Sequence, residues 1–244
     1  MATGAIKWDQ AGDKRYETGV DHGVLYVKQA TDVTVPGVTN SVKTYFHGGV
    51  AWNGLTSVSK SPSGAEANDV YADNIKYASL RSAETFGGTI EAYTYPDEFA
   101  ECDGSKAIVD GVFLGQQTRK PFGFCFRTDM GDDGDGSVNV NDKYKIHLIY
   151  NATASPSESS YSTINDSPEA ITFSWELTTI PVSAGANNLP TATITIDSTK
   201  TNASKLAAFE AILYGTDPTT QGGNDGTEPM LPMPEDVIAF FTAT

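Results

Sequence analysis

Basic residues, cysteines and long hydrophobic runs are scarce in this sequence. Its 244 residues include 16 Lys and Arg against 31 Asp and Glu, a formal net charge of −15. Because a field of that sign repels phosphate, the charge argues against tight binding to nucleic acid or to an anionic membrane surface. No stretch approaches the roughly 18 uninterrupted apolar residues of a membrane-spanning helix. The N-terminal residues also lack the apolar region of a signal peptide, so we expect synthesis in a cytoplasm.

Cysteine is too rare for a disulfide framework, because Cys102 and Cys125 are the only two. Cys125 lies in the aromatic run PFGFCFRTD and is predicted to be a small buried side chain. Cys102, in AECDG, is predicted to be a loop thiol. A bridge between the two thiols is not favoured in a cytoplasmic protein.

Residues for catalysis or metal binding are also few. None of the three histidines has a second ligand at the spacing of a zinc site: His22, His47 and His147. His147 is expected to lie on a strand face with one hydrogen bond. The sequence contains neither a GxSxG elbow nor a GxxxxGK[ST] phosphate loop. A triad whose members meet only in space stays open, but we predict no catalytic and no cofactor-binding residues.

One acidic segment, Asp129–Asp142, invites comparison with a calcium loop. An EF-hand needs oxygen ligands at its third and twelfth positions, where this segment has Gly131 and Val140. The pattern fails, so no metal site is predicted. We interpret the segment as a hydrated hairpin loop whose carboxylates repel one another, while a looser oxygen cage for a cation stays open.

Alternating segments rich in β-branched and aromatic residues make up most of the chain. The predicted strands are His22–Lys28, Val42–Phe46, Val50–Val58, Thr89–Tyr95, Phe122–Thr128, Tyr144–Tyr150, Ala170–Ile180 and Thr191–Asp197. In Ala170–Ile180, one face carries Ile171, Phe173, Trp175 and Leu177, and the other carries Thr172, Ser174 and Glu176. One buried and one wet face are typical of antiparallel sheets. The fold class predicted is therefore a mainly β, antiparallel sandwich or barrel in a single domain, residues 1–244.

Helices are expected to be few. Pro96–Cys102 predicts a short helix, and Ala203–Gly215 predicts a longer one with Gly215 as its C-terminal cap. PEDVIAFF, near the C-terminus, predicts a third helical turn. The Pro- and Gly-rich residues 216–234 predict a flexible connector or projecting arm.

Several long segments, in this order, resemble the major tail tube proteins of long-tailed bacteriophages, especially those with non-contractile tails (siphophages). They are Val20–Val27, Gly49–Glu66, Tyr71–Gly104, Ile146–Val182, Ala192–Lys200 and Leu206–Asp217. The resemblance covers most of the chain and is weakest at Asp129–Asp142 and Thr219–Thr244.

This resemblance implies a structural virion protein and no enzyme. Its fold would be a β-sandwich with one flanking α-helix, and six copies would join their strands into a ring barrel. Stacked rings would form the tail tube, assembled in the host bacterial cytoplasm, through which double-stranded DNA passes without specific binding. The further partners implied are a tape-measure protein, a tail terminator, and distal tail or tail-tip proteins; no membrane is involved.

The charge then suggests that an acidic channel wall keeps DNA from sticking, although it could instead serve only solubility. Long polar loops predict ring-to-ring contacts at Pro218–Pro234 and Ser59–Asn68. Within the first of these, three apolar residues could anchor a neighbour or cover the subunit's own core: Met230, Leu231 and Met233. Two other classes stay open, a carbohydrate-binding or adhesin-type β-sandwich and a cell-wall hydrolase.

Overall fold

Nine antiparallel strands form the central sheet of the computed structural model, which describes residues 5–9, 14–64, 66–132, 143–157, 160–161, 163, 170–219 and 225–243. The strands are β1 (Tyr16–Val33), β2 (Thr44–Phe46), β3 (Val50–Trp52), β4 (Leu55–Lys60), β9 (Gly87–Ala92), β12 (Phe122–Gly131), β13 (Tyr144–Ala154), β14 (Phe173–Thr179) and β15 (Thr193–Asp197). Their order is β2-β1-β12-β13-β14-β9-β4, with β15 paired to β13 and β3 paired to β1. The predicted mainly β, antiparallel fold is confirmed.

A sharp bend divides the predicted strand Val50–Val58 into β3 and β4. Gly54 has a φ of +77°, and a Cβ atom there would lie 2.9 Å from the Thr94 side chain, so glycine is required at the bend. Before it, β3 pairs with β1; after it, β4 pairs with β9 at the opposite end of the sheet order. The sheet therefore curls into two layers, and the described strands form a sandwich without a closed barrel.

The space between the two layers is filled mainly by aromatic side chains. Trp52 packs against Phe99 and Trp175, with ring centroids 4.6 and 5.5 Å apart. Phe99 ends the short helix η1 (Asp97–Phe99), which runs into α1 (Ala100–Asp103), so the predicted helix Pro96–Cys102 is present. The prediction for Cys102 was wrong: its thiol is fully buried, because α1 carries it into this core.

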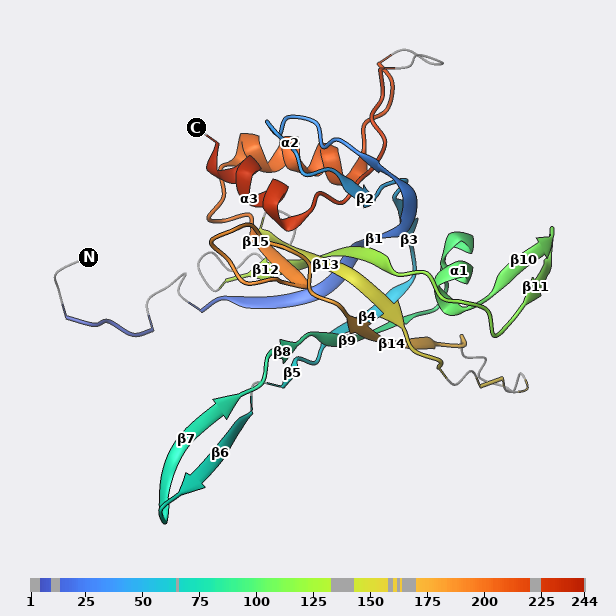
Figure 1. The fold of residues 1–244 in the computed structure, drawn as a ribbon. Coiled ribbons are helices and arrows are strands. Elements are labelled where there is room, and N and C mark those ends of the chain that lie inside the picture. Colours follow the sequence, from blue (N-terminus) through green and yellow to red (C-terminus); the bar gives the residue numbers. More distant parts are fainter. Residues whose placement is uncertain are drawn as a thin grey trace.

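Two helices cover the other face of the sheet, where a second core forms (Figure 1). Helix α2 (Ala203–Tyr214) matches the prediction; Asn202 caps it by accepting from two backbone N–H groups, and Gly215 follows it. Leu206, Phe209 and Leu213 of α2 lie against the sheet, where buried Cys125 joins them as predicted. The expected C-terminal turn is longer, a nine-residue helix α3 (Pro234–Thr242).

Three ribbons project from this layered body in different directions (Figure 1). The first combines β5 (Ser63–Gly64) with β8 (Glu84–Thr85) and β6 (Ala67–Ala72) with β7 (Ile75–Arg81). The second pairs β10 (Lys106–Val109) with β11 (Val112–Leu114), and the third is closed at its base by the bridge between Thr216 and Thr227. The prediction of a loop over Ser59–Asn68 was therefore wrong, because most of that segment belongs to strands.

Candidate functional site

The outward face of β4, β9 and β14 is an unusually uniform polar surface. Because side chains alternate along a strand, Val58, Ile90 and Trp175 point into the core and their neighbours point outward. The strand registers align the outward side chains in two cross-strand rows: Ser57, Glu91 and Ser174, then Ser59, Thr89 and Glu176. None of these described positions carries Lys or Arg. We call these six residues the hydroxyl–carboxylate face.

Hydrogen bonding keeps the hydroxyl–carboxylate face flat. The Ser57 hydroxyl donates to Oε2 of Glu91 at 2.8 Å, across the β4–β9 pair. The remaining members are short side chains apart from Glu176, which is exposed. A surface of hydroxyls and negative carboxylates offers a polyanion no cationic partner and repels its phosphates.

The single basic residue of β4 turns away from this face. Lys60 Nζ donates to Nδ1 of His147 at 2.7 Å, which links the two layers of the sandwich at one end of the inner core. The ring of His147 stacks on Phe126 with centroids 4.7 Å apart, and its Nε2 lies 3.0 Å from the Thr128 hydroxyl. With Nδ1 accepting from the ammonium, Nε2 carries the proton and donates to Thr128.

Burial sets the protonation of this pair. Desolvation, and secondarily the positive charge of Lys60, lowers the pKa of His147 to about 4. Desolvation likewise lowers the pKa of Lys60. The expectation of one hydrogen bond for His147 was wrong, since its ring also contacts the Thr195 hydroxyl. Sequence alternation places the residue on a strand face but does not show that another layer closes over it.

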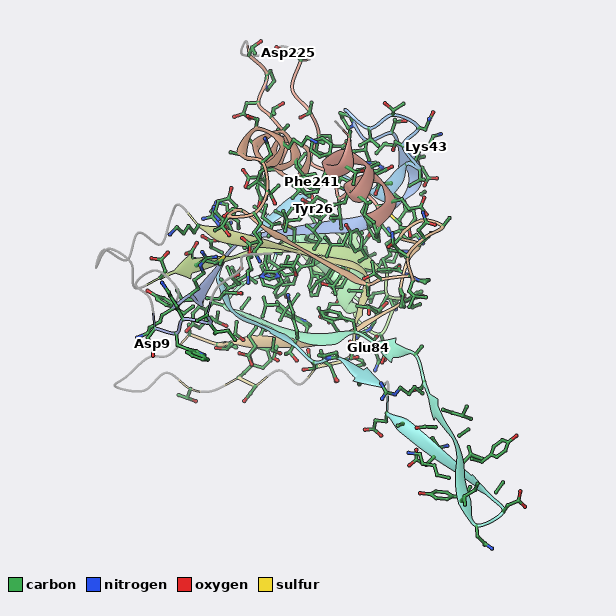
Figure 2. All side chains as sticks on the ribbon, turned by 90° about the vertical axis from the view of Figure 1, so that its left-hand side faces the viewer. Asp9, Tyr26, Lys43, Glu84, Asp225 and Phe241 are labelled. Atoms are coloured by element: carbon green, nitrogen blue, oxygen red, sulfur yellow. The ribbon has the colours of Figure 1, made fainter. Side chains whose placement is uncertain are left out.

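The ribbon of β6 and β7 is amphipathic, although its side chains are almost all exposed and neither face packs on the body of the subunit. On one face, Asp69 accepts from Lys76 Nζ at 2.7 Å and from the Ser79 hydroxyl at 2.8 Å. The opposite face carries Val70 and Leu80, which are 38% and 59% exposed. Figure 2 shows the side chains of this ribbon standing free on both sides of it, beyond Glu84, where the ribbon leaves the body.

The shorter ribbon of β10 and β11 exposes a similar apolar surface. Five large apolar side chains are exposed along it: Ile108, Val109, Val112, Phe113 and Leu114. A two-stranded ribbon is marginally stable alone, and exposed apolar patches mark contact sites with other molecules. Both ribbons are thus suited to contact a partner. Sequence patterns gave little sign of them, because each strand is short and lacks a buried face.

The predicted arm, residues 216–234, consists of two unlike parts. Residues 216–219 and 225–227 belong to the projecting ribbon, whose hydroxyls Thr216 and Thr227 lie 2.9 Å apart. Beyond it the chain is held in the core: Leu231 N donates to Phe46 O at 2.8 Å, and the Thr44 hydroxyl donates to Leu231 O at 2.6 Å.

These contacts decide between the two roles that the sequence left open for the apolar residues of the arm, anchoring a neighbour or covering the subunit's own core. The three apolar residues of the arm cover the subunit's own core, with exposed fractions of 7%, 0% and 9%: Met230, Leu231 and Met233. The flexibility of the remainder stays a prediction, and residues 220–224 lie outside the described residues.

No group of His, Cys, Asp and Glu within the described part of the chain has the geometry of a metal site. Most of the acidic loop Asp129–Asp142 lies outside that part, so the cation cage stays untested. Both cysteines are fully buried free thiols, and desolvation raises each pKa to about 12. No helix among the described residues is long and apolar enough to cross a bilayer.

Comparison with protein-family models identifies a family. A family model described as phage tail tube protein matches residues 26–223, well over half of the chain. The matched range includes the hydroxyl–carboxylate face and both apolar ribbons. A search of curated proteins finds no match.

Proposed function

The chain belongs to the phage tail tube protein family, and on that premise we propose that six copies form a ring, that rings stack into the tube, and that viral DNA leaves through its channel. The protein is then a structural component of the virion tail. Its partners would be further copies of itself and the tail proteins at either end of the tube.

The hydroxyl–carboxylate face carries this proposal as the wall of the channel. It spans three strands, and the end of β13 extends it to four because Thr153 pairs with Thr178 of β14. Six copies would then supply about 24 strands, and strands spaced ~4.8 Å and tilted ~45° give a barrel radius of roughly 26 Å. After side chains are subtracted, a bore of about 40 Å remains, and DNA needs only about 20 Å.

Charge supports the same placement. Six copies at −15 each carry a formal −90 per ring, and Glu91 and Glu176 put part of it on the proposed wall. The Debye length is about 8 Å at physiological salt, so repulsion acts only near the surface and keeps DNA centred. The hydrogen bond to His147 turns Lys60, the one basic residue of β4, away from this face, although its side chain stays exposed to solvent.

The ribbons fit the contacts between rings. The β6–β7 ribbon extends far beyond the body of its own subunit (Figure 1). Its exposed apolar face is therefore available for contact with a neighbouring copy. Of the segment Ser59–Asn68, for which a contact was predicted, Ser63–Gly64 and Ala67–Asn68 lie in the strands of that ribbon, and Ser59–Lys60 belong to β4. Of the other predicted contact, Pro218–Pro234, the described residues 218–219 and 225–227 belong to the projecting ribbon, and residues 230–233 are buried.

A map of assembled tubes by cryo-electron microscopy tests the proposal. We expect sixfold rings in which Ser57, Glu91 and Glu176 face the axis. A tube with this face on its outer surface would overturn the channel assignment, and a chain that forms no tube would overturn the proposed function.

Charge reversal on the hydroxyl–carboxylate face is a functional test of the same assignment. Tubes carrying Glu91→Lys and Glu176→Lys should retain duplex DNA at low salt and release it as salt rises. The matched control, Asp97→Lys and Glu98→Lys, changes the net charge equally at exposed positions of η1, away from the face. Equal retention of DNA by both variants would contradict the assignment of the wall.

A further inference from the structure

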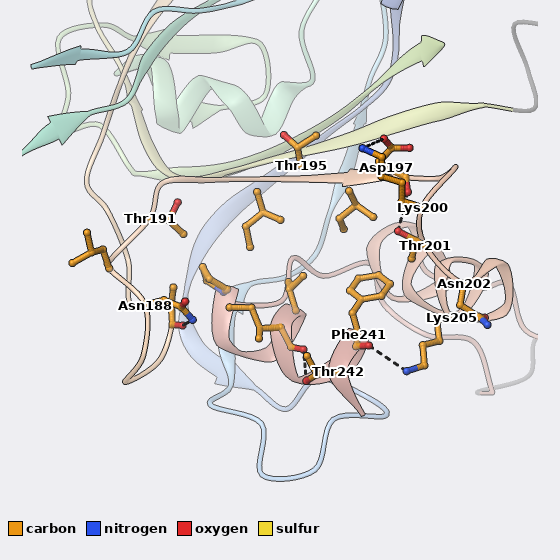
Figure 3. Close-up of a pocket in the computed structure, with 17 residues that line it drawn as sticks. Asn188, Thr191, Thr195, Asp197, Lys200, Thr201, Asn202, Lys205, Phe241 and Thr242 are labelled. Atoms are coloured by element: carbon orange, nitrogen blue, oxygen red, sulfur yellow. Dashed lines mark hydrogen bonds and ion pairs between the residues drawn. The ribbon is translucent and has the colours of Figure 1, made fainter. Parts of the chain in front are cut away.

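An apolar groove of about 810 Å³ lies between β15 and α3 (Figure 3). Ile194 and Ile196 of β15 face Val237 and Phe241 of α3 across it, and Lys200 and Asp197 form an ion pair of 3.6 Å at one end. The volume is within the range of protein ligand pockets. Leu189 and Ile238 on the rim are 87% and 39% exposed, so the groove leaves apolar surface in water.

One edge of this groove can also accept an extended chain. Tyr150 N donates to Ala192 O and Ser198 N donates to Tyr144 O, so even-numbered residues of β15 bond to β13 and odd-numbered residues face outward. Among those, the backbone N–H and C=O of Thr195 have no partner within the described residues. An unpaired backbone edge beside an apolar groove suits the addition of a strand.

The N-terminal segment Ala5–Asp9 has the complementary character. Its side chains Ile6 and Trp8 are 75% and 77% exposed. They are two residues apart, so an extended chain points both to the same side and Lys7 to the other. Burying two such side chains contributes roughly 1.5–3 kcal/mol each, which makes their exposure in a lone subunit costly.

The placement of this segment favours a second copy as its receiver. Arg15 and Tyr16, where β1 begins, share a hollow with Asp197 and Lys200 at the end of the groove. Ala5–Asp9 lie clear of the layered body of their own subunit (Figure 1), so a neighbouring copy can reach them. The segment therefore leaves its own groove empty and carries its apolar side chains outward.

We propose that Ala5–Asp9 of one copy lie along the β15–α3 groove of a neighbouring copy. Ile6 and Trp8 enter the groove, and the backbone pairs with Thr195. This inference rests on the proposed self-assembly and names the surfaces that meet in it.

Tryptophan fluorescence tests the proposal directly. Trp52 and Trp175 are each 2% exposed, so the difference between wild type and Trp8→Phe isolates the emission of Trp8. We expect iodide to quench this emission in dispersed subunits, with a severalfold loss of quenching and a blue shift on assembly. Equal quenching in subunits and tubes would overturn the placement of Ala5–Asp9 in the groove, without contradicting the proposal that the subunits form tubes.

Cross-linking of mixed chains that each carry one added cysteine then identifies the site. A Trp8→Cys chain mixed with a differently tagged Ile238→Cys chain should form a disulfide-linked heterodimer. Both native thiols are buried, so they do not compete for this link. Ile180→Cys, 66% exposed and outside the groove, is the control for Ile238→Cys and should form much less. A chain that carries both Trp8→Cys and Ile238→Cys tests whether the segment enters the groove of its own subunit. If a link forms only within that chain and not between chains, the exchange between copies is overturned. Micrographs of the same samples separate the cases, because subunits that form no tubes overturn both proposals.

Discussion

The contact between buried His147 and Lys60 predicts a specific dependence of stability on pH. The pKa of His147 is about 4 in the folded subunit and about 6.5 in an unfolded chain. Between these values the unfolded chain binds a proton that the folded chain does not, so stability falls as pH drops from 6.5 toward 4. Above pH 6.5 the ring is neutral in both states, and this contribution is flat.

The expected size follows from the two pKa values. Each pKa unit corresponds to about 1.4 kcal/mol. Between about pH 6.5 and pH 4 the free energy of unfolding therefore falls by about 3.4 kcal/mol, and roughly 2 kcal/mol of this is lost by pH 5. The negative charge of Glu17, paired with Lys145 beside the ring, is already included in the pKa of His147, whereas solvent screening of the part-buried Lys60 contact reduces the free energy. We therefore expect a loss of about 1–2 kcal/mol between pH 7 and pH 5 that is due to His147.

Urea unfolding of unassembled subunits at both pH values measures this loss. His147→Gln keeps a polar side chain but cannot titrate, so its stability should fall by about 1–2 kcal/mol less than that of the wild type. His22→Gln, at a half-exposed histidine that contacts Asp21 outside the core, shows what the loss of a histidine elsewhere in the subunit does. Parallel losses in wild type and His147→Gln would refute the buried, neutral histidine.

Three further predictions concern other parts of the fold. Asp236 is 2% exposed and accepts from the Ser41 hydroxyl and from Val42 N, so Asp236→Ala should cost about 2–3 kcal/mol in urea unfolding and Asp236→Asn less. Both native thiols should resist a thiol reagent at pH 8 until the chain unfolds, and rapid reaction of the folded protein would contradict their burial. Deleting residues 66–83 should leave the unfolding midpoint of the subunit nearly unchanged and abolish tubes, because this ribbon lies outside both cores; normal tubes would exclude it as a contact.

One strand of the candidate wall is readable in the sequence, and the alignment of its neighbours is not. The alternation around Trp175 is sufficient to place Ser174 and Glu176 on the wet face of a strand. Nothing local shows that β9 and β4 align Glu91 and Ser57 beside them. Registers between strands far apart in sequence depend on the bend at Gly54 and on packing across the sandwich.

The projecting ribbons and the end of the chain show where local patterns mislead. The strands of both ribbons have little buried face, so they lack the alternation that marks a strand packed on a core. Met230 and Leu231 lie in a Pro- and Gly-rich stretch typical of a linker, yet hydrogen bonds from Met230 to α2 and between Leu231 and β2 hold them in the core. Composition describes the flexibility that a segment would have alone, and tertiary contacts override it.

The sequence by itself determined the class of fold, the negative charge, and the segments that resemble tail tube proteins, because period-two alternation and composition are properties of short stretches. Only the tertiary structure decided which polar residues share a face, that Lys60 turns inward to His147, and that Cys102 is buried. These depend on the meeting of strands distant along the chain, where burial and pairing are settled by packing of the whole sheet.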